Sequence, residues 1–169
     1  MTRLILVDEQ DNELGIADRD QAHKAGKLHR AVSVFILNGV GELLLQRRAS
    51  TKALFAGKWA NTCCTHPRAG ESVIQAGERR LLEEMSLEVS LGSVGTFLYH
   101  ARDAATGYIE HELDHVLVGH SENDPVLNPD EADAFIWADL VELRGVAGSD
   151  PGYAPWLGLA LAAFPSLGA

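Results

Sequence analysis

Residues 71–85 read ESVIQAGERRLLEEM, and this stretch alternates apolar and charged side chains at helical spacing. Val73 and Leu81 belong to its apolar side, and charged residues lie between the apolar positions. Gly70 precedes the segment, and Glu71 supplies a negative charge to the first turn, where a helix favours one. The segments on either side of this helix have the composition of strands. A helix between groups of strands predicts a mixed α/β or α+β domain.

Runs of β-branched and apolar residues predict the strands. They cover residues 4–7, 31–37, 43–45, 94–99, 108–119 and 134–138. Asn38-Gly39 lies between the second and third runs and predicts an antiparallel hairpin. Further short helices are predicted after Asp18, at 140–143 and at 155–164. No repeat or linker divides the chain, so we expect a single domain over residues 1–169, an α+β fold with a central mixed sheet flanked by helices.

The overall composition is that of an ordinary globular protein of 169 residues with a net charge of −10. Its apolar runs are shorter than the ~18–20 residues that cross a bilayer, and the polar start Met1-Thr2-Arg3 is unlike a secretory signal. An acidic chain is also poorly suited to general nucleic-acid binding. We therefore expect a cytoplasmic protein with neither a membrane nor a nucleic-acid partner.

The charge is distributed unevenly along the chain. Residues 21–70 carry eight basic side chains and one acid, Glu42, a net of +7, whereas residues 81–169 carry two bases and fifteen acids, a net of −13. A solvated basic face would explain the first segment. A pocket for a compact polyanion beside carboxylates that hold cations would explain both. Composition alone leaves both interpretations open.

The two cysteines are adjacent, at Cys63 and Cys64. Neighbouring side chains in an extended chain point apart, so a disulfide between them is not expected. Two free thiols fit a reducing compartment, and a free cysteine is most often a small buried apolar residue.

Several histidines and carboxylates could bind a metal. Glu110 and Glu112 lie two apart in a predicted strand and project from the same face, which for an isolated pair more often means ordinary surface charge. His23, His29 and His66 would complete a transition-metal site with them, although their spacing forms no local motif. The other histidines compete for this role: His100, His111, His115 and His120.

The predicted central helix carries Arg79 and Arg80 one turn before Glu83 and Glu84. Ion pairs between residues four apart would account for all four as a solvated helix face. A role in binding metal and phosphate would require the carboxylates to lie near the basic segment.

The stretch Gly57–Pro67, GKWANTCCTHP, resembles the W-x-N-[ST]-x-C-x-H-P signature of the type 1 isopentenyl-diphosphate isomerases, a branch of the Nudix superfamily. Further matches follow the family's order along the chain: His23 and His29, Arg47–Lys52, the E-x-E of Glu110 and Glu112, and Pro155-Trp156. The resemblance extends from Val7 to Trp156 and implies a Nudix-like fold.

The resemblance also implies a function, the interconversion of isopentenyl and dimethylallyl diphosphate in isoprenoid biosynthesis. The matching catalytic positions are Cys64, Glu112 and the assisting Tyr99. Those matching the ligands of a zinc or manganese ion are His23, His29, His66, Glu110 and Glu112, and Glu84 matches the ligand of a magnesium ion. The positions matching the substrate-binding side chains are Arg19, Arg48, Lys52 and Arg80 around the diphosphate and Trp156 near the hydrocarbon. The expected partner is this small-molecule diphosphate, bound by a monomer or weak homodimer.

The chain departs from the box G-x5-E-x7-R-E-U-x-E-E-x-G of hydrolytic Nudix enzymes. Thr65 and Ser86 replace its first and last glycines, and Arg80 replaces the glutamate after its arginine. The lost carboxylate argues against diphosphate hydrolysis, and Arg80 would instead help to hold the diphosphate. The alternatives are a Nudix-type pyrophosphohydrolase acting on a nucleoside diphosphate derivative and a metal- or isoprenoid-diphosphate-binding module. A binding module would leave the acid and base residues unexplained.

Overall fold

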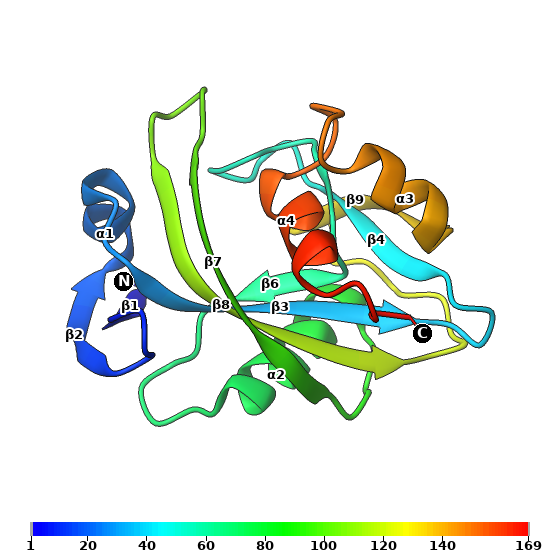
Figure 1. Cartoon of the computed structure of the whole chain (residues 1–169), viewed down its shortest axis with the longest axis horizontal. Coiled ribbons are helices and arrows are strands. Elements are labelled where there is room, and N and C mark those ends of the chain that lie inside the picture. Colours follow the sequence, from blue (N-terminus) through cyan, green and yellow to red (C-terminus); the bar gives the residue numbers. More distant parts are fainter. Residues whose placement is uncertain (1, 169) are drawn as a thin grey trace.

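Strand β3 (His29–Leu37) runs through the middle of the sheet in the computed structural model, which describes residues 2–168 (Figure 1). It is parallel to β8 (Ile109–His120) and antiparallel to β1 (Arg3–Val7), β4 (Leu43–Arg48) and β6 (Cys63–Thr65). One parallel pair among antiparallel ones makes the sheet mixed, as predicted.

The remaining strands extend the sheet from these. Strand β2 (Glu13–Asp18) pairs with β1, and β7 (Gly92–Arg102) pairs with β8. Strands β5 (Trp59–Ala60) and β9 (Ala132–Ala138) both pair with β4. Strands and helices alternate irregularly along the chain, so the predicted α+β class is confirmed.

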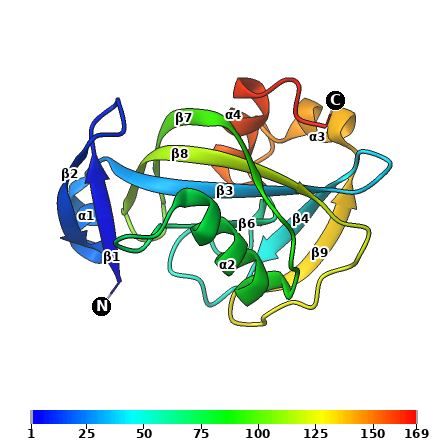
Figure 2. The ribbon, with the colours of Figure 1, turned by 90° about the horizontal axis from the view of Figure 1, so that it is seen from below.

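Helices cover both faces of the sheet. Helix α2 (Val73–Met85) lies on one face, and α3 (Leu140–Val146) and α4 (Pro155–Ala163) lie on the other (Figure 2). The short helix α1 (Arg19–Ala25) lies at the end of the sheet that β1 and β2 form (Figure 1).

Strand β3 is apolar on both sides because each side faces a helix layer. Val34 and Ile36 pack in the core beneath α2 with Leu81, whereas Phe35 packs with Leu157 of α4. A strand buried on both faces has a nearly continuous apolar sequence, which explains the run AVSVFIL.

On the face of the sheet that α4 covers, the side chains of β3 and β8 change from apolar to polar along the strands. Near α4 they are apolar, for example Phe35 and Val116. Towards α1 the same face carries His29, Glu110 and Glu112, all buried. The strands therefore place a polar cluster next to an apolar core on one continuous surface.

The helix starts have the expected capping chemistry. The side chain of Asp18 accepts a hydrogen bond from the backbone N–H of Gln21 at the start of α1. Ser72 and Gln75 form a reciprocal capping box at the start of α2, so this helix begins at Val73, two residues after the predicted start.

The predicted hairpin is confirmed only at its turn. Leu37 pairs with Leu43, after which β4 continues towards β5 and β9 while β3 pairs with β6 and β8. Strand β2 was not predicted, because Glu13–Asp18 is largely exposed and has little apolar pattern. Within residues 2–168, no helix has the length and apolar character needed to cross a membrane.

Candidate active site

Glu112 occupies the centre of a row of three side chains on neighbouring strands. On one side its register partner is His29 of β3, and on the other it is Tyr99 of β7. The Nε2 atom of His29 lies 3.4 Å from Oε1 of Glu112, and the hydroxyl of Tyr99 donates a hydrogen bond to Oε2. The strand register therefore places His29 and Tyr99 on opposite sides of Glu112, where each contacts a different oxygen of its carboxylate.

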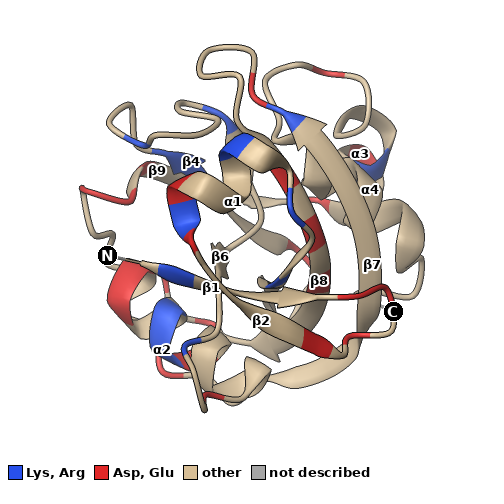
Figure 3. Ribbon diagram, turned by 90° about the vertical axis from the view of Figure 1, so that its left-hand side faces the viewer, with Lys and Arg blue, Asp and Glu red and all other residues tan. Residues whose placement is uncertain are grey.

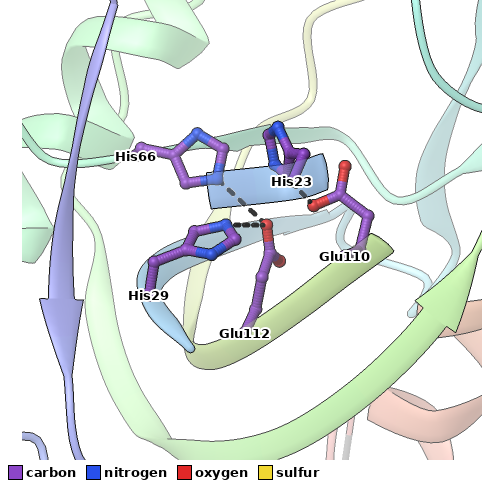
Figure 4. Close-up of side chains that lie close together, drawn as sticks. All are labelled: His23, His29, His66, Glu110 and Glu112. Carbon is purple, nitrogen blue, oxygen red and sulfur yellow. Dashed lines mark hydrogen bonds and ion pairs between the residues drawn. The ribbon is translucent and has the colours of Figure 1, made fainter. Parts of the chain in front are cut away.

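Three more side chains complete this cluster (Figure 4). His66 follows β6 and brings Nε2 to 3.0 Å from Oε1 of Glu112. His23, on α1, brings Nε2 to 3.2 Å from Oε2 of Glu110. The candidate ligand atoms of His23, His29, His66, Glu110 and Glu112 all lie within 4.8 Å of one another.

The donor atoms of this cluster fit a bound cation. Nδ1 of His29 lies 2.8 Å from the carbonyl oxygen of Lys27, so an N–H there leaves the lone pair of Nε2 directed at the cluster. Nε2 of His23, Nε2 of His29 and Oε2 of Glu110 are buried without hydrogen-bond partners among residues 2–168. Buried polar atoms without partners are costly, and a metal ion would satisfy all three at once. Imidazole and carboxylate donors suit a divalent transition metal.

The cluster is electrostatically coupled. Burial opposes ionisation of Glu112, but its contacts with His29 and His66 outweigh burial and hold the pKa of this carboxyl well below its usual range. Burial also lowers the pKa of His66, whereas for His29 the contact with Glu112 overcomes burial and raises the pKa. An ionised carboxylate and a neutral His66 are the forms that bind metal.

Cys64 lies beside this cluster in a network of polar side chains. Its thiol donates a hydrogen bond to Oδ1 of Asn61 over 3.3 Å, and the same oxygen accepts from the indole N–H of Trp156 at 3.0 Å. On its other side Sγ lies 3.5 Å from Oγ of Ser33. Cys63 points away into the core beneath α2, and both cysteines are free thiols.

The thiol is protonated in this environment. Burial and the nearby charge of Asp114 raise the pKa of Cys64 to about 12. A group with this pKa keeps its proton at neutral pH, so Cys64 is a thiol and not a thiolate in the described structure.

An aromatic and apolar wall surrounds these groups. Trp156 packs against Phe55 at a ring distance of 5.2 Å and against Tyr99 at 6.1 Å. Cys64 and Tyr99 belong to this same apolar cluster, which also includes Leu54. These side chains form an apolar surface next to Cys64.

Lys52 and Arg80 form a second, charged cluster. Both contact Glu131, with Nη2 of Arg80 2.7 Å from its Oε2. Nε of Arg80 also lies 2.5 Å from Oε1 of Glu84, whose Oε2 accepts a hydrogen bond from Gln46 at 2.9 Å. Burial raises the pKa of Glu84, and Arg80 opposes this effect. Figure 3 shows Lys and Arg on α1 and β4 and both signs of charge on α2.

The predicted site residues thus fall into separate groups in the structure. The five histidine and glutamate positions come together, as do Cys64, Tyr99 and Trp156, whereas Glu84 lies with Arg80 outside the five-residue cluster. Arg48 stacks over Trp156 at 5.5 Å and donates to the carbonyl of Leu54, which joins the basic segment to the aromatic wall.

Arg19 is half-buried at the start of α1, the helix that carries His23. The i,i+4 ion pairs predicted on α2 are present between Arg79 and Glu83 and between Arg80 and Glu84. The local ion pairs are therefore confirmed, but Glu84 is buried and does not belong to a solvated face. Arg80 also reaches Glu131, and a role of this helix in binding metal and phosphate stays a prediction.

Sequence reasoning missed three residues of the site. Asp114 continues the alternation of Glu110 and Glu112 along β8, and this pattern could have identified it. Ser33 and Glu131 carry no such signal, because β3 and the residues before β9 meet the site only through the sheet topology.

Comparisons with known proteins agree with this architecture. A model of the NUDIX domain matches residues 27–157. An isopentenyl-diphosphate Delta-isomerase 2 of Photorhabdus laumondii is 44% identical over 154 residues, which cover 90% of this chain and 86% of that protein. An isopentenyl-diphosphate Delta-isomerase of Halorhodospira halophila is 43% identical over 159 residues, 92% of this chain and 91% of that protein.

Solved structures share the fold at low sequence identity. A crystal structure of a Deinococcus radiodurans protein superposes with a TM-score of 0.79 at 22% identity and covers 96% of this chain and 98% of its own. A MutT protein of Methanosarcina mazei gives a TM-score of 0.69 at 20% identity, with coverage of 82% and 94%. At this identity the likeness shows the fold alone, which is the Nudix-like fold expected from the sequence.

Proposed function

Because this chain belongs to the NUDIX family and, within it, to the isopentenyl-diphosphate Delta-isomerases, we propose that its histidine–glutamate cluster and Cys64 form the active site. The enzyme interconverts isopentenyl diphosphate and dimethylallyl diphosphate. This reaction adds a proton at one end of a carbon–carbon double bond and removes a proton from the carbon beyond its other end. The observation that supports the assignment most strongly is the contact of Tyr99, His29 and His66 with one carboxylate, Glu112.

The metal-binding role follows from the donor set. We assign the ligands of a zinc or manganese ion to His23, His29, His66, Glu110 and Glu112, whose donor atoms lie within 4.8 Å of one another. When bound, such an ion supplies positive charge that orients the carboxylates and tunes their proton affinity. Unpartnered buried atoms on three of these residues support this assignment.

Glu112 is assigned as one of the two proton-transferring groups. Protonation of an unactivated alkene forms a tertiary carbocation, so the acid must be held firmly against the double bond. Tyr99 contacts Oε2, whereas His29 and His66 contact Oε1, and the carboxylate is therefore fixed from both sides. The hydroxyl of Tyr99 gives the proton on Glu112 a neighbouring group with which to exchange.

Cys64 is assigned as the second proton-transferring group. One of Cys64 and Glu112 adds the proton and the other removes it, and the two exchange roles when the reaction runs in reverse. The apolar cluster against which the half-buried Cys64 packs would shield the carbocation from attack by water. Trp156 lies in the same apolar cluster, where its ring can stabilise a nearby cation by roughly 2 kcal/mol in a desolvated site.

We assign the diphosphate to four basic side chains: Arg19, Arg48, Lys52 and Arg80. Of these, Arg48 lies over Trp156 of the aromatic wall. Glu131 neutralises Lys52 and Arg80 in the described structure, and Glu84 also pairs with Arg80. A magnesium ion held by Glu84 would offset the charge of the diphosphate. These pairs would then exchange partners, with the basic groups turning to phosphate oxygens.

Nudix-type hydrolysis of a nucleoside diphosphate derivative is disfavoured by the same cluster. Arg80 stands where the hydrolytic box has a glutamate, and its guanidinium is committed to carboxylates on two sides. This arrangement holds an anion but removes a magnesium ligand.

A direct test incubates the purified protein with isopentenyl diphosphate, zinc and magnesium, and in parallel with a panel of nucleotides. We expect the dimethylallyl isomer and no cleavage of the nucleotides. Cleavage of a nucleotide to its monophosphate without isomerisation would favour the hydrolase.

The wider assignments extend the same proposal. We assign residues 1–169 to a single isomerase domain that acts as a monomer or weak homodimer in the cytoplasm on a soluble diphosphate, without nucleic-acid or membrane partners. Sedimentation of the metal-loaded protein tests the assembly state.

A further inference from the structure

Two buried polar side chains, Ser33 and Asp114, form a chain of contacts that ends at Cys64. Ser33 is the register partner of Cys64 across β3 and β6, and Asp114 projects towards it from β8. Oγ of Ser33 lies 2.6 Å from Oδ2 of Asp114 and 3.5 Å from Sγ of Cys64. Each of the two is only 1% exposed. Ser33 therefore connects the buried carboxyl group to the thiol.

Packing alone does not explain this pair. Burying a carboxyl group is costly unless it is well hydrogen-bonded, and Oδ1 of Asp114 has no partner in the part of the chain described, residues 2–168. Apolar residues of similar volume would usually pack here at lower cost. Buried polar groups that contact a reactive side chain are typical of functional sites.

Two side-chain oxygens, one of Asn61 and one of Ser33, lie close enough to the sulfur of Cys64 to orient its thiol. Its S–H donates to Asn61, whose side-chain amide is itself fixed by donation to the carbonyls of Val34 and Cys63. Oγ of Ser33 lies 3.5 Å from the sulfur and, because its own hydrogen is donated to Asp114, can accept the S–H as an alternative to Asn61. A side chain held on one side only can leave its rotamer, and a small displacement of a reacting atom is costly in rate.

We propose that Ser33 is a positioning residue for the isomerisation: its hydroxyl, held in place by Asp114, orients Sγ of Cys64 towards the substrate. This inference rests on the proposed role of Cys64 in proton transfer. It concerns the hydrogen-bond geometry around the sulfur, and it assigns neither Ser33 nor Asp114 a contact with the substrate.

The test compares two substitutions at one position. Ser33→Ala removes the hydroxyl with almost no change of volume, and we expect kcat to fall about 10- to 100-fold. KM for isopentenyl diphosphate should remain within about twofold, because the hydroxyl of Ser33 contacts Asp114 and Cys64 and none of the basic side chains assigned to the diphosphate. Ser33→Thr keeps the hydroxyl and should retain kcat within about threefold of the wild type.

Measurements on the wild type and on Cys64→Ala separate this inference from the proposed function. An inactive wild type, or an active Cys64→Ala variant, would overturn the function itself. With an active wild type and an inactive Cys64→Ala variant, unchanged kcat in Ser33→Ala would overturn the positioning role alone.

Thermal unfolding and a third variant guard against a purely structural effect. Equal losses of kcat in Ser33→Ala and Ser33→Thr, each with a lowered unfolding midpoint, would make Ser33 a packing residue and contradict the inference. Asp114→Asn keeps an oxygen that accepts from Ser33, so its kcat should stay closer to the wild type than that of Ser33→Ala. A larger loss in Asp114→Asn would overturn the role of this hydrogen bond.

Discussion

Tyr99 and Glu112 are register partners on adjacent strands, and the hydroxyl of Tyr99 donates a hydrogen bond to the carboxylate of Glu112. Both side chains are buried, Tyr99 at 6% and Glu112 at 6% exposure. Burial and the charge of Glu112 raise the pKa of Tyr99 well above its usual value, so the phenol remains a proton donor. The pair joins the histidine–glutamate cluster to the aromatic wall.

Removing this hydroxyl tests the contribution of Tyr99. Tyr99→Phe preserves the ring packing against Phe97 and Trp156 but leaves Oε2 of Glu112 without this donor. We expect kcat to fall about 10- to 100-fold with little change in KM, measured by steady-state isomerisation. Tyr153→Phe is a matched control outside this aromatic cluster and should stay within about twofold of the wild type. Equal rates for Tyr99→Phe and the wild type would show that the hydroxyl takes no part.

The adjacent cysteines form an internal control. Cys64 faces the polar network with Asn61, whereas Cys63 is fully buried beneath α2. Cys64→Ala should abolish turnover, because it removes the group that we assign to proton transfer, and Cys63→Ala should keep kcat near that of the wild type. Cys63→Ala leaves a small cavity, so a modest loss of stability, of about 1 kcal/mol, should appear in denaturant unfolding. An active Cys64→Ala enzyme would contradict the assigned role.

The assignment of a metal ion to the histidine–glutamate cluster predicts a loss of zinc affinity when one carboxylate is neutralised. Glu110→Gln keeps the shape of the side chain but removes the negative charge of its carboxylate. Oε2 of this carboxylate lies 3.2 Å from Nε2 of His23. Zinc affinity, measured by competition with a chelator, should fall at least about tenfold. Glu122→Gln makes the same chemical change at an exposed position of the chain and should leave the affinity unchanged. Equal affinities for the two variants would remove Glu110 from the ligand set.

An ion pair at the start of α2 predicts a pH-dependent stability. The hydrogen bond from Arg79 lowers the pKa of Glu71 below its usual value of 4.5, with Nε of Arg79 2.7 Å from Oε1. Because the pKa of Glu71 is lower in the folded state, its ionised carboxylate stabilises the fold above pH 4.5. This stabilisation is lost as the pH falls through the folded-state pKa. Glu71→Gln should therefore cost about 1 kcal/mol at pH 7 and progressively less below pH 4.5.

Urea unfolding of the wild type and Glu71→Gln at several pH values checks this prediction, with the exposed Glu88→Gln as the control. A difference in unfolding free energy that grows as the pH falls would contradict the assigned sign.

Local elements were the most predictable part of the fold. The helix of residues 73–85 and the strands around it follow from periodicity and capping residues, which act within a few positions of the chain. The pairing of β3 was less predictable, because a strand that is apolar on both faces does not show which neighbour it takes. The continuation of β4 towards β9 likewise depends on packing between distant segments.

The site residues likewise include some that the local sequence predicts and others that depend on the folded chain. Glu110 and Glu112 share a face by strand alternation, which the sequence shows directly. His23 and His66 reach them from α1 and from the end of β6, and only the resemblance to a known family selected them over the other histidines. The neutral state of Cys64 and the contact of Ser33 with it depend on burial and register, which appear only in the folded chain.

Isomerisation of isopentenyl diphosphate in deuterated water tests the central claim most directly. The account requires a solvent-exchangeable group on Glu112 or Cys64 to add one hydrogen and the other group to remove a different one. Mass and NMR spectra of the dimethylallyl diphosphate should therefore show deuterium in the newly formed methyl group, and Glu112→Gln should form no product. Product that forms without deuterium, or cleavage of the diphosphate in place of isomerisation, would contradict this account.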